Sequence, residues 1–351
     1  MTKVNLTING QSVEAEASMT ILEAAESAGI EIPTFCHDPQ LVGVGACRIC
    51  VVEVEGWGNL PASCVAPVVD GIVVNTESEN VIKARQANLS LLLANHPLDC
   101  LTCEKSGECR LQDYSYKYGV EKTDYEGEVI DYPVEDSNPF YERDMNKCIL
   151  CGKCARVCFE INGAGAIDYA NRGFKSTIAA AFFEPMENSS CVFCGMCVDI
   201  CPVGALTPKL NRFKGRAWEI EKVSTICPYC GTGCAINLHV KDNEVVGASG
   251  DKEGPVNKGH VCVKGHFGWD FIHSPDRLTK PLIKKNGQFE EASWEEAISL
   301  VADKFKSTVD KDGGGALAGL ASARCTSEDN YLFQKLLRVL GTNSIDHCAR
   351  L

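Results

Sequence analysis

The chain has 351 residues, a formal net charge of −13 and 21 cysteines. The negative charge disfavours nucleic acids and anionic membranes as partners, because both would repel the protein. No apolar run reaches the roughly 18 residues that a membrane-spanning helix needs, and the first ten residues lack the features of a secretion signal. We therefore expect a cytoplasmic protein with reduced cysteines, which are more often metal ligands than disulfide partners.

The first part of the chain, residues 1–78, is expected to form a small β-rich domain. Apolar and polar residues alternate at its start, as in a half-buried strand, and Asn9-Gly10 is a typical hairpin turn. Thr20 then precedes a short run with helical character and is expected to cap it.

The middle of the chain is rich in cysteine. Residues 79–140 begin with a predicted helix over 79–95 and contain an acidic stretch, 121–138, that we interpret as a linker. Residues 141–215 hold two similar cysteine-rich runs, which form an internal repeat, and residues 216–272 hold a further cysteine group.

The last part, residues 273–351, changes character. Ser293 and Glu296 form a capping-box motif at the start of an amphipathic helix that Gly313 ends. An apolar strand and a helix over about 327–340 follow, an order that opens an α/β domain. A single strand and helix cannot bury their own faces, so we expect this domain to be incomplete.

The first candidate metal site is a 2Fe–2S site on the β-rich domain. A lone cysteine, a close pair and a distal cysteine resemble the plant-type ferredoxin layout, although the first gap is longer. Gly43 and Gly45 lie between the first two ligands and allow the backbone to approach sulfur. A zinc site is the alternative. The candidate ligands are Cys36, Cys47, Cys50 and Cys64.

The second candidate is a 4Fe–4S site with a histidine ligand. A lone histidine is more often structural than a ligand, but His96 precedes three cysteines at a spacing that resembles the large iron–sulfur subunit of respiratory complex I and the iron-only hydrogenases. A neutral imidazole in place of a thiolate should raise the reduction potential. The candidate ligands are His96, Cys100, Cys103 and Cys109.

The third and fourth candidates come from the internal repeat, which matches the bacterial ferredoxin pattern of Cys-x2-Cys-x2-Cys-x3-Cys. In that pattern the fourth cysteine of each run ligates the other cluster. Phe159 stands where the pattern usually has proline, but that proline is not a ligand. The two expected sets are Cys148, Cys151, Cys154 and Cys201, and Cys191, Cys194, Cys197 and Cys158.

The fifth candidate is a cysteine group followed by Val263-Lys264-Gly265. It resembles the N-terminal 4Fe–4S site of the bis-pterin molybdenum and tungsten oxidoreductases, a resemblance that places Lys264 in the electron path to the nearer pterin. The alternative is an ordinary surface lysine. The ligands would be Cys227, Cys230, Cys234 and Cys262, and the two cysteines left over, Cys325 and Cys348, are expected to be structural thiols that are buried or free.

The resemblance covers nearly the whole chain. Residues 1–215 resemble the N-terminal arm shared by complex I and iron-only hydrogenases, and residues 220–351 resemble formate dehydrogenase catalytic subunits. It implies an α+β multidomain fold with a β-grasp 2Fe–2S domain, a histidine-containing 4Fe–4S domain, a two-cluster ferredoxin domain and the incomplete start of a molybdopterin oxidoreductase.

The resemblance also implies cofactors and partners. It gives one 2Fe–2S and four 4Fe–4S clusters, and a molybdenum or tungsten bis(pyranopterin guanine dinucleotide) centre for formate and CO2 in the full-length enzyme. Electrons would leave to a flavin- and NAD-binding diaphorase of the complex I type, with ferredoxin or hydrogenase subunits as further partners. The alternatives are a complex I large iron–sulfur subunit and a non-catalytic electron-transfer subunit of a hydrogenase or dehydrogenase complex.

In formate dehydrogenases a run similar to Ala349-Arg350-Leu351 precedes the metal ligand, cysteine or selenocysteine. We therefore expect no catalytic residue in this chain, and a truncation at a selenocysteine codon read as a stop. A deliberately shortened or processed fragment is the other interpretation. The chain as given is expected to transfer electrons without oxidising formate.

Overall fold

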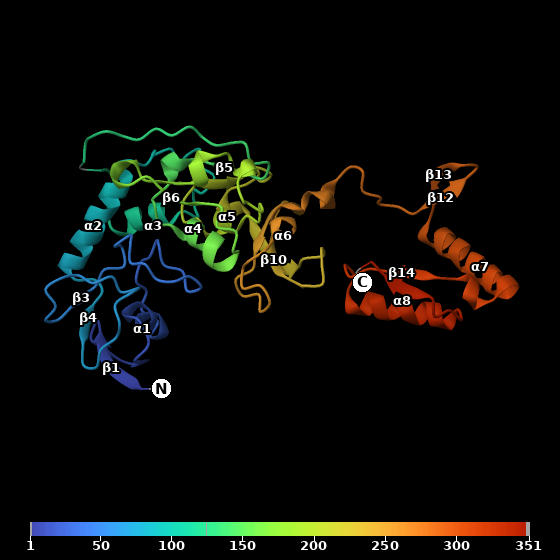
Figure 1. The fold of residues 1–351 in the computed structure, drawn as a ribbon, viewed down its shortest axis with the longest axis horizontal. Coiled ribbons are helices and arrows are strands. Elements are labelled where there is room, and N and C mark those ends of the chain that lie inside the picture. The colour runs from blue at the N-terminus through green and yellow to red at the C-terminus, as the bar shows by residue number, and fades with distance from the viewer. Residues whose placement is uncertain (1, 124, 349–351) are drawn as a thin grey trace. The chain divides into compact units, whose positions relative to one another are not determined.

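The computed structural model describes residues 2–123 and 125–348 and confirms the expected α+β fold with several small domains (Figure 1). The chain forms two compact units, one up to residue 221 and one from residue 222 onward. None of the helices in the described part of the chain is long and apolar enough to cross a bilayer.

The first unit begins with a four-stranded sheet in the order β2-β1-β4-β3, with β1 antiparallel to β2 and parallel to β4. The predicted hairpin turn is present, with Asn9 and Gly10 both at positive φ. Thr20 and Glu23 form a capping box at the start of the expected helix. The elements are β1 (Lys3–Ile8), β2 (Gln11–Glu16), α1 (Ile21–Ser27), β3 (Glu53–Val54) and β4 (Val73–Asn75).

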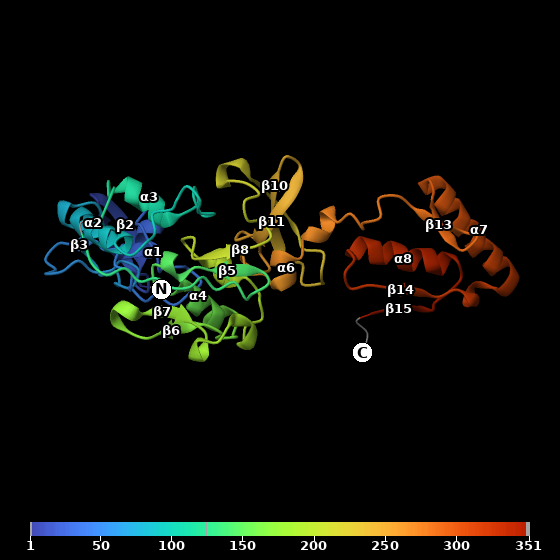
Figure 2. The same ribbon diagram turned by 90° about the horizontal axis from the view of Figure 1, so that it is seen from above.

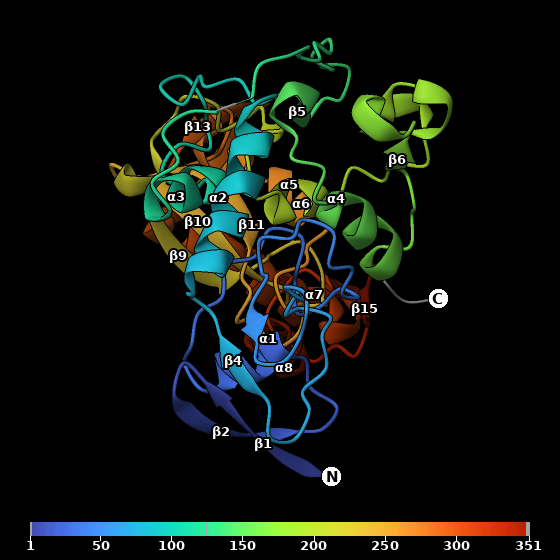
Figure 3. The same ribbon diagram turned by 90° about the vertical axis from the view of Figure 1, so that its left-hand side faces the viewer.

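Two helices follow this sheet and lie side by side, α2 (Glu79–Leu93) and α3 (Arg110–Lys117) (Figure 3). The predicted helix over 79–95 is therefore confirmed, and it ends two residues earlier than expected. The acidic stretch after α3 contains no helix or named strand in its described residues. It is more than a linker, however, because Glu135 pairs with Arg143 and Asn138 is fully buried.

The ferredoxin-like part of the first unit consists of short elements. Strand β5 pairs with β8 and β6 with β7, both antiparallel. The strands are β5 (Tyr141–Arg143), β6 (Asp168–Ala170), β7 (Thr177–Ala179) and β8 (Leu206–Pro208). The helices are α4 (Lys153–Arg156), which continues as a π-helical turn η2 (Val157–Ile161), α5 (Met196–Ile200), and the 3-10 turns η1 (Met145–Lys147), η3 (Gly173–Lys175), η4 (Ala181–Phe183), η5 (Met186–Asn188) and η6 (Ala217–Glu219).

The second unit starts with a three-stranded sheet in the order β11-β10-β9, followed by a short helix. Its elements are β9 (Glu221–Ile226), β10 (Ala235–Lys241), β11 (Glu244–Gly250), α6 (Val263–Phe267) and the 3-10 turn η7 (Asp270–His273). Strand β9 begins at the boundary between the units.

The rest of the second unit contains two small sheets and two long helices. Its elements are β12 (Leu282–Lys285), β13 (Gln288–Glu291), α7 (Trp294–Asp312), the 3-10 turn η8 (Gly314–Ala316), β14 (Gly319–Ala321), α8 (Ser327–Val339) and β15 (Ile345–His347). Strands β14 and β15 are parallel, and α8 lies beside them (Figure 2).

The expected capping box at α7 is only half formed. The Ser293 side chain accepts a hydrogen bond from the Glu296 N–H, as predicted. The Glu296 carboxylate instead accepts from the Lys285 ammonium at 3.1 Å. A neighbouring cation on β12 therefore replaces the backbone N–H that the sequence motif offered.

Candidate iron–sulfur sites

The four cysteines expected to hold a 2Fe–2S cluster lie together in the first domain. Cys50 Sγ is 3.4 Å from Cys64 Sγ. Hydrogen bonds from the Cys47 and Cys64 thiols lower the pKa of Cys36 to about 2, and the Cys64 thiol lowers the pKa of Cys50 to about 6. The four sulfurs are thus close enough to share protons, and the deprotonated form is the one that binds metal.

The loop between these ligands approaches them as the glycines suggested. Gly45 has a φ of +60°, a conformation that L side chains rarely adopt. A Cβ at Gly43 would lie 2.9 Å from the Cys64 carbonyl oxygen. Both positions therefore require glycine for the loop to lie against the Cys64 segment.

The two ring nitrogens of His96 differ in their hydrogen bonding. Its Nδ1 lies 2.8 Å from the Pro97 carbonyl oxygen, so Nδ1 carries the proton and donates it. Its Nε2 is buried and has no hydrogen-bond partner among the described residues. Burial lowers the pKa of His96, which favours the neutral ring. A neutral imidazole with one nitrogen held by a carbonyl is the usual state of a histidine metal ligand.

The three cysteines of this second site influence one another electrostatically. Burial raises the pKa of Cys109, and the charges of Cys103 and Cys100 raise it further. Lys147, which the sequence analysis missed, lies at this site and forms ion pairs with Asp99 at 3.0 Å and Asp144 at 3.3 Å. A cation in this position would partly offset the charge of thiolates nearby.

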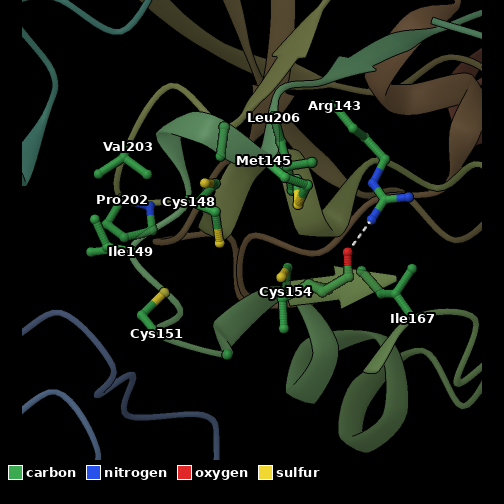
Figure 4. Close-up of a pocket in the computed structure, with 14 residues that line it drawn as sticks. Arg143, Met145, Cys148, Ile149, Cys151, Cys154, Ile167, Pro202, Val203 and Leu206 are labelled. Carbon is green, nitrogen blue, oxygen red and sulfur yellow. Dashed lines mark hydrogen bonds between the residues drawn. The ribbon is translucent and has the colours of Figure 1, made fainter. Parts of the chain in front are cut away.

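The first cysteine set of the repeat lines one pocket. Figure 4 shows Cys148, Cys151 and Cys154 around it, and Cys201 is part of the same lining. The Leu150 N–H donates to Cys148 Sγ at 3.4 Å. Burial raises the pKa of Cys154 well above its usual range.

Arg143 lines the same pocket (Figure 4). Its Nη1 pairs with the Glu135 carboxylate, and its Nη2 donates to the Ile178 carbonyl at 2.7 Å. Its Nε is buried and lacks a partner among the described residues. A cation with a spare donor therefore borders the expected cluster, and no spacing motif in the sequence pointed to it.

The second set of the repeat also comes together. Burial raises the pKa of Cys197, and the charges of Cys194, Cys191 and Cys158 raise it further. The Tyr141 hydroxyl lies 3.6 Å from Cys191 Sγ. Burial is the main cause of a raised pKa at Tyr141, so this hydroxyl keeps its proton.

The structure places the fourth cysteine of each run with the other run. Besides burial, the charge of Cys201 raises the pKa of Cys151, and that of Cys158 raises the pKa of Cys194. Helices α4 and α5, which follow the two runs, contact each other directly. In the ferredoxin pattern the fourth cysteine of each run binds the cluster of the other run, and the positions of these cysteines are compatible with that arrangement.

The fifth set lies in the second unit and is less covered. Cys227 is buried, whereas Cys230 and Cys262 are exposed. Burial raises the pKa of Cys234, and the charges of the other three cysteines add to this effect. Lys264 lines an apolar pocket together with Cys227, and its Nζ lies 6.0 Å from the centre of the Tyr229 ring.

The two cysteines outside the five sets agree only in part with the expectation. Cys325 and Cys348 are free, as one form of the expectation allowed, but both are exposed and neither is buried. The Cys348 Sγ lies 3.8 Å from Ser322 Oγ. The run at 349–351, next to which a catalytic metal ligand was expected, lies outside the described residues.

Three of the sites share one hydrophobic core. Its buried members include Cys36, Cys109 and Cys151, one from each of the first three sets. The Arg110 N–H, next to Cys109, donates to the Pro202 carbonyl, next to Cys201, at 3.1 Å. This backbone hydrogen bond and the shared core connect the third set to the second.

The third set is also tied to the first. Lys153 on α4 pairs with Asp38 at 3.6 Å, and both side chains are largely buried. Arg156 on the same helix donates to the carbonyls of Val42 and Cys36. Helix α4, which carries Cys154, is thus fixed to the loop that carries Cys36.

Five protein-family models match successive parts of the chain. The matching models are a 2Fe-2S iron-sulfur cluster binding domain at 1–79, an NADH-ubiquinone oxidoreductase-G iron-sulfur binding region at 85–124, the ferredoxin-like domain of NADH-quinone oxidoreductase subunit 3 at 138–207, a molybdopterin oxidoreductase Fe4S4 domain at 220–274 and a molybdopterin oxidoreductase domain at 277–351.

Two relatives align over 99% of this chain. The NADPH-Fe(3+) oxidoreductase subunit alpha of Geobacter sulfurreducens is 42% identical over 349 residues, and an NADH-quinone oxidoreductase subunit of Rhizobium meliloti is 40% identical over 350 residues. The chain spans about 40% of the length of each. A Staphylococcus aureus protein whose name suggests a formate dehydrogenase is 33% identical over 387 residues, which are 98% of this chain and 39% of that protein.

A solved structure supports the same grouping. A chain in the crystal structure of an NAD+-reducing [NiFe]-hydrogenase in the H2-reduced state is 33% identical, with a TM-score of 0.57. The match covers 60% of this chain and 90% of that one. The present chain is therefore similar to the iron–sulfur subunits of complex I-like oxidoreductases, and its cluster-binding regions are followed by residues that match a molybdopterin oxidoreductase domain.

Proposed function

We propose that this chain passes single electrons through one 2Fe–2S and four 4Fe–4S clusters. The ligands would be the five residue sets of the sequence analysis, which use 19 cysteines and one histidine. The observation that carries the proposal is His96, whose Nδ1 is tied to a carbonyl while its buried Nε2 is left without a partner in the described part of the chain. That state suits a ligand nitrogen.

The contacts between sites favour a branched electron path, with the third set at the branch point, over a linear one. The third set, which holds Cys148, Cys151, Cys154 and Cys201, contacts the first set through α4 and the second through Pro202. It also lies near the fourth set, since the charge of Cys197 contributes to the raised pKa of Cys154 after burial and the nearer thiols. An electron at the third set can therefore pass to the first or the second.

The proposed substrate of the whole protein is formate. When bound, a molybdenum or tungsten bis-pterin centre supplies two-electron formate and CO2 interconversion. The residues that match the molybdopterin oxidoreductase model, the Staphylococcus aureus relative and the place of Lys264 beside Cys227 support this choice. Lys264 would lie in the electron path between the Cys227 cluster and that centre, and residues 273–351 would begin the pterin-binding domain.

The proposed partner is a flavin- and NAD-binding diaphorase of the complex I type. The support comes from the Rhizobium meliloti relative and from the NAD+-reducing hydrogenase, whose names refer to NADH and NAD+. Hydrogenase subunits and ferredoxin remain further candidates for the same role.

A second candidate function is NAD(P)H-driven electron transfer without formate chemistry. It is favoured by the higher identity to the NADPH-Fe(3+) oxidoreductase subunit alpha, 42% against 33% for the relative named after formate. In that function the clusters would receive electrons from a nicotinamide-binding partner and deliver them to another acceptor.

Metal analysis and spectroscopy test the cluster content. The anaerobically reconstituted chain should hold about 18 iron atoms, two from the 2Fe–2S site and sixteen from the four 4Fe–4S sites. Bound zinc, or iron below roughly half of that value after full reconstitution, would contradict the ligand assignment.

Two reductants distinguish the candidate functions. The native protein, purified anaerobically from its host with its bound cofactors, is mixed with formate or with NADPH and followed by EPR. Cluster reduction by formate supports the formate proposal. Reduction by NADPH together with no response to formate would favour the second candidate.

A further inference from the structure

Strand β5 lies between the two sites of the ferredoxin-like repeat. Its first and last residues, Tyr141 and Arg143, are buried, while Glu142 between them is partly exposed. Alternate side chains of a strand point to the same face, so Tyr141 and Arg143 both face inward. Tyr141 reaches the site of Cys191, and Arg143 lines the site of Cys148.

The two side chains differ in charge. Arg143 is a cation with only 4% of its surface exposed. Two of its nitrogens are used by Glu135 and the Ile178 carbonyl, which hold the guanidinium in place, while its buried Nε–H has no acceptor among the described residues. Among the side chains that line this pocket, sulfur atoms are the acceptors, four of them from cysteines.

Tyr141 offers a neutral donor instead. Its hydroxyl lies 3.6 Å from Cys191 Sγ, and its side chain is 1% exposed. Reduction adds one electron, and hence one negative charge, to a cluster. A donor bearing positive charge stabilises that added charge more than a neutral hydroxyl does.

We propose that β5 separates the reduction potentials of the two repeat clusters, with Arg143 raising the potential at the Cys148 site above that at the Cys191 site. In this role Arg143 donates through Nε–H to a sulfur of the Cys148 cluster, and Tyr141 donates to Cys191. The inference rests on the ligand sets of the proposed function. Its consequence is that an electron entering at the Cys191 site moves downhill to the Cys148 site, which is the branch point.

The test uses the reconstituted 351-residue protein and redox titration followed by EPR. Cys154→Ser and Cys194→Ser each remove one ligand and identify the signal of their own cluster. Arg143→Gln should lower the midpoint potential of the Cys148 cluster and leave the Cys191 cluster unchanged. Tyr141→Phe should lower the midpoint potential of the Cys191 cluster by less, and leave the other unchanged.

A second variant should shift the potential of the Cys148 cluster in the opposite direction, and it keeps the test usable if Arg143→Gln misfolds. Glu135→Gln removes the countercharge of Arg143 but keeps an oxygen that can accept from the Met186 N–H, which donates to Glu135 at 2.9 Å. It should raise the potential of the Cys148 cluster. The rise should be larger at the Cys148 cluster than at the Cys191 cluster, because the unpaired charge of Arg143 then borders the Cys148 site.

The outcomes separate the two proposals. If neither serine variant changes a 4Fe–4S signal, the ligand assignment is wrong. If the signals are assigned but Glu135→Gln and Arg143→Gln leave the Cys148 potential unchanged, or shift both clusters equally, the role of β5 is disproved. If Arg143→Gln does not fold, the proposal is decided by whether Glu135→Gln shifts the potential of the Cys148 cluster more than that of the Cys191 cluster.

Discussion

The two units of the chain hold their clusters in different ways. In the first unit, cysteines from three sites are buried members of one hydrophobic core. In the second unit, the buried apolar cluster around the site consists of Cys227, Ile236 and Val261, and two of the four cysteines are exposed. Ligation and folding should therefore be coupled in the first unit, whereas the second unit should lose its cluster with little effect elsewhere.

The largest effect is expected at Arg85, which fixes the first unit. Its guanidinium has no exposed surface and donates to the carbonyls of Ile49 and Val51 at 3.1 and 3.0 Å and to the Tyr118 hydroxyl at 2.8 Å. Arg85→Ala leaves these buried acceptors unpaired and should lower the free energy of unfolding by about 3–5 kcal/mol, because each unpaired buried acceptor costs about 1–3 kcal/mol. Denaturant titration of the protein measures this change.

The matched control is Lys83 on the same helix. Its ammonium is exposed and pairs with Glu79 one turn away. Lys83→Ala should cost about 0.3–0.5 kcal/mol, because exposed pairs of this kind contribute little. Equal losses for Lys83→Ala and Arg85→Ala would contradict the assignment of Arg85 to the core.

The next effect concerns Cys151, a buried ligand in the shared core. Cys151→Ser should remove about four iron atoms per chain. It should also weaken retention of the Cys36 and His96 clusters on warming, because they pack against the same core. Iron analysis before and after a heat step checks both effects, and unchanged retention at the other sites would show that the core does not couple them.

Cys230 gives the contrasting result in the second unit. It is exposed, so Cys230→Ser should also remove about four iron atoms but leave the thermal stability and EPR signals of the first unit unchanged. The same iron analysis and heat step serve here. A loss of first-unit signals would remove the contrast between the units.

The smallest effect is expected at His96. His96→Cys should keep the iron content and lower the potential of this cluster, because a fourth thiolate adds negative charge. Redox titration followed by EPR measures the shift. His96→Gln is the control, which removes the imidazole without adding a thiolate, and an unaltered spectrum in both variants would show that His96 is not a ligand.

The sequence correctly predicted those elements that depend only on residues close together in the chain. The Asn9-Gly10 turn, the Thr20 cap and the helix that begins at Glu79 all depend on residues close in the chain. The half-formed capping box at Ser293 shows the limit of such predictions. The Glu296 carboxylate accepts a hydrogen bond from Lys285, which lies on another element, and only the Ser293 half of the box forms. For Cys325 and Cys348 the sequence left open whether the thiols are buried or free, and the structure shows both free and exposed.

The sequence by itself determined the candidate ligands, because a cluster ligated by short Cys-x2-Cys runs requires cysteines at short, fixed spacings that can be counted along the chain. Only the tertiary structure decided which uncharged and charged groups border them. Arg143, Tyr141 and Lys147 follow no motif, and they reach their sites through strand pairing and core packing. Electrostatic effects depend on distance in space, and the chain brings these groups to the cysteines only when it folds.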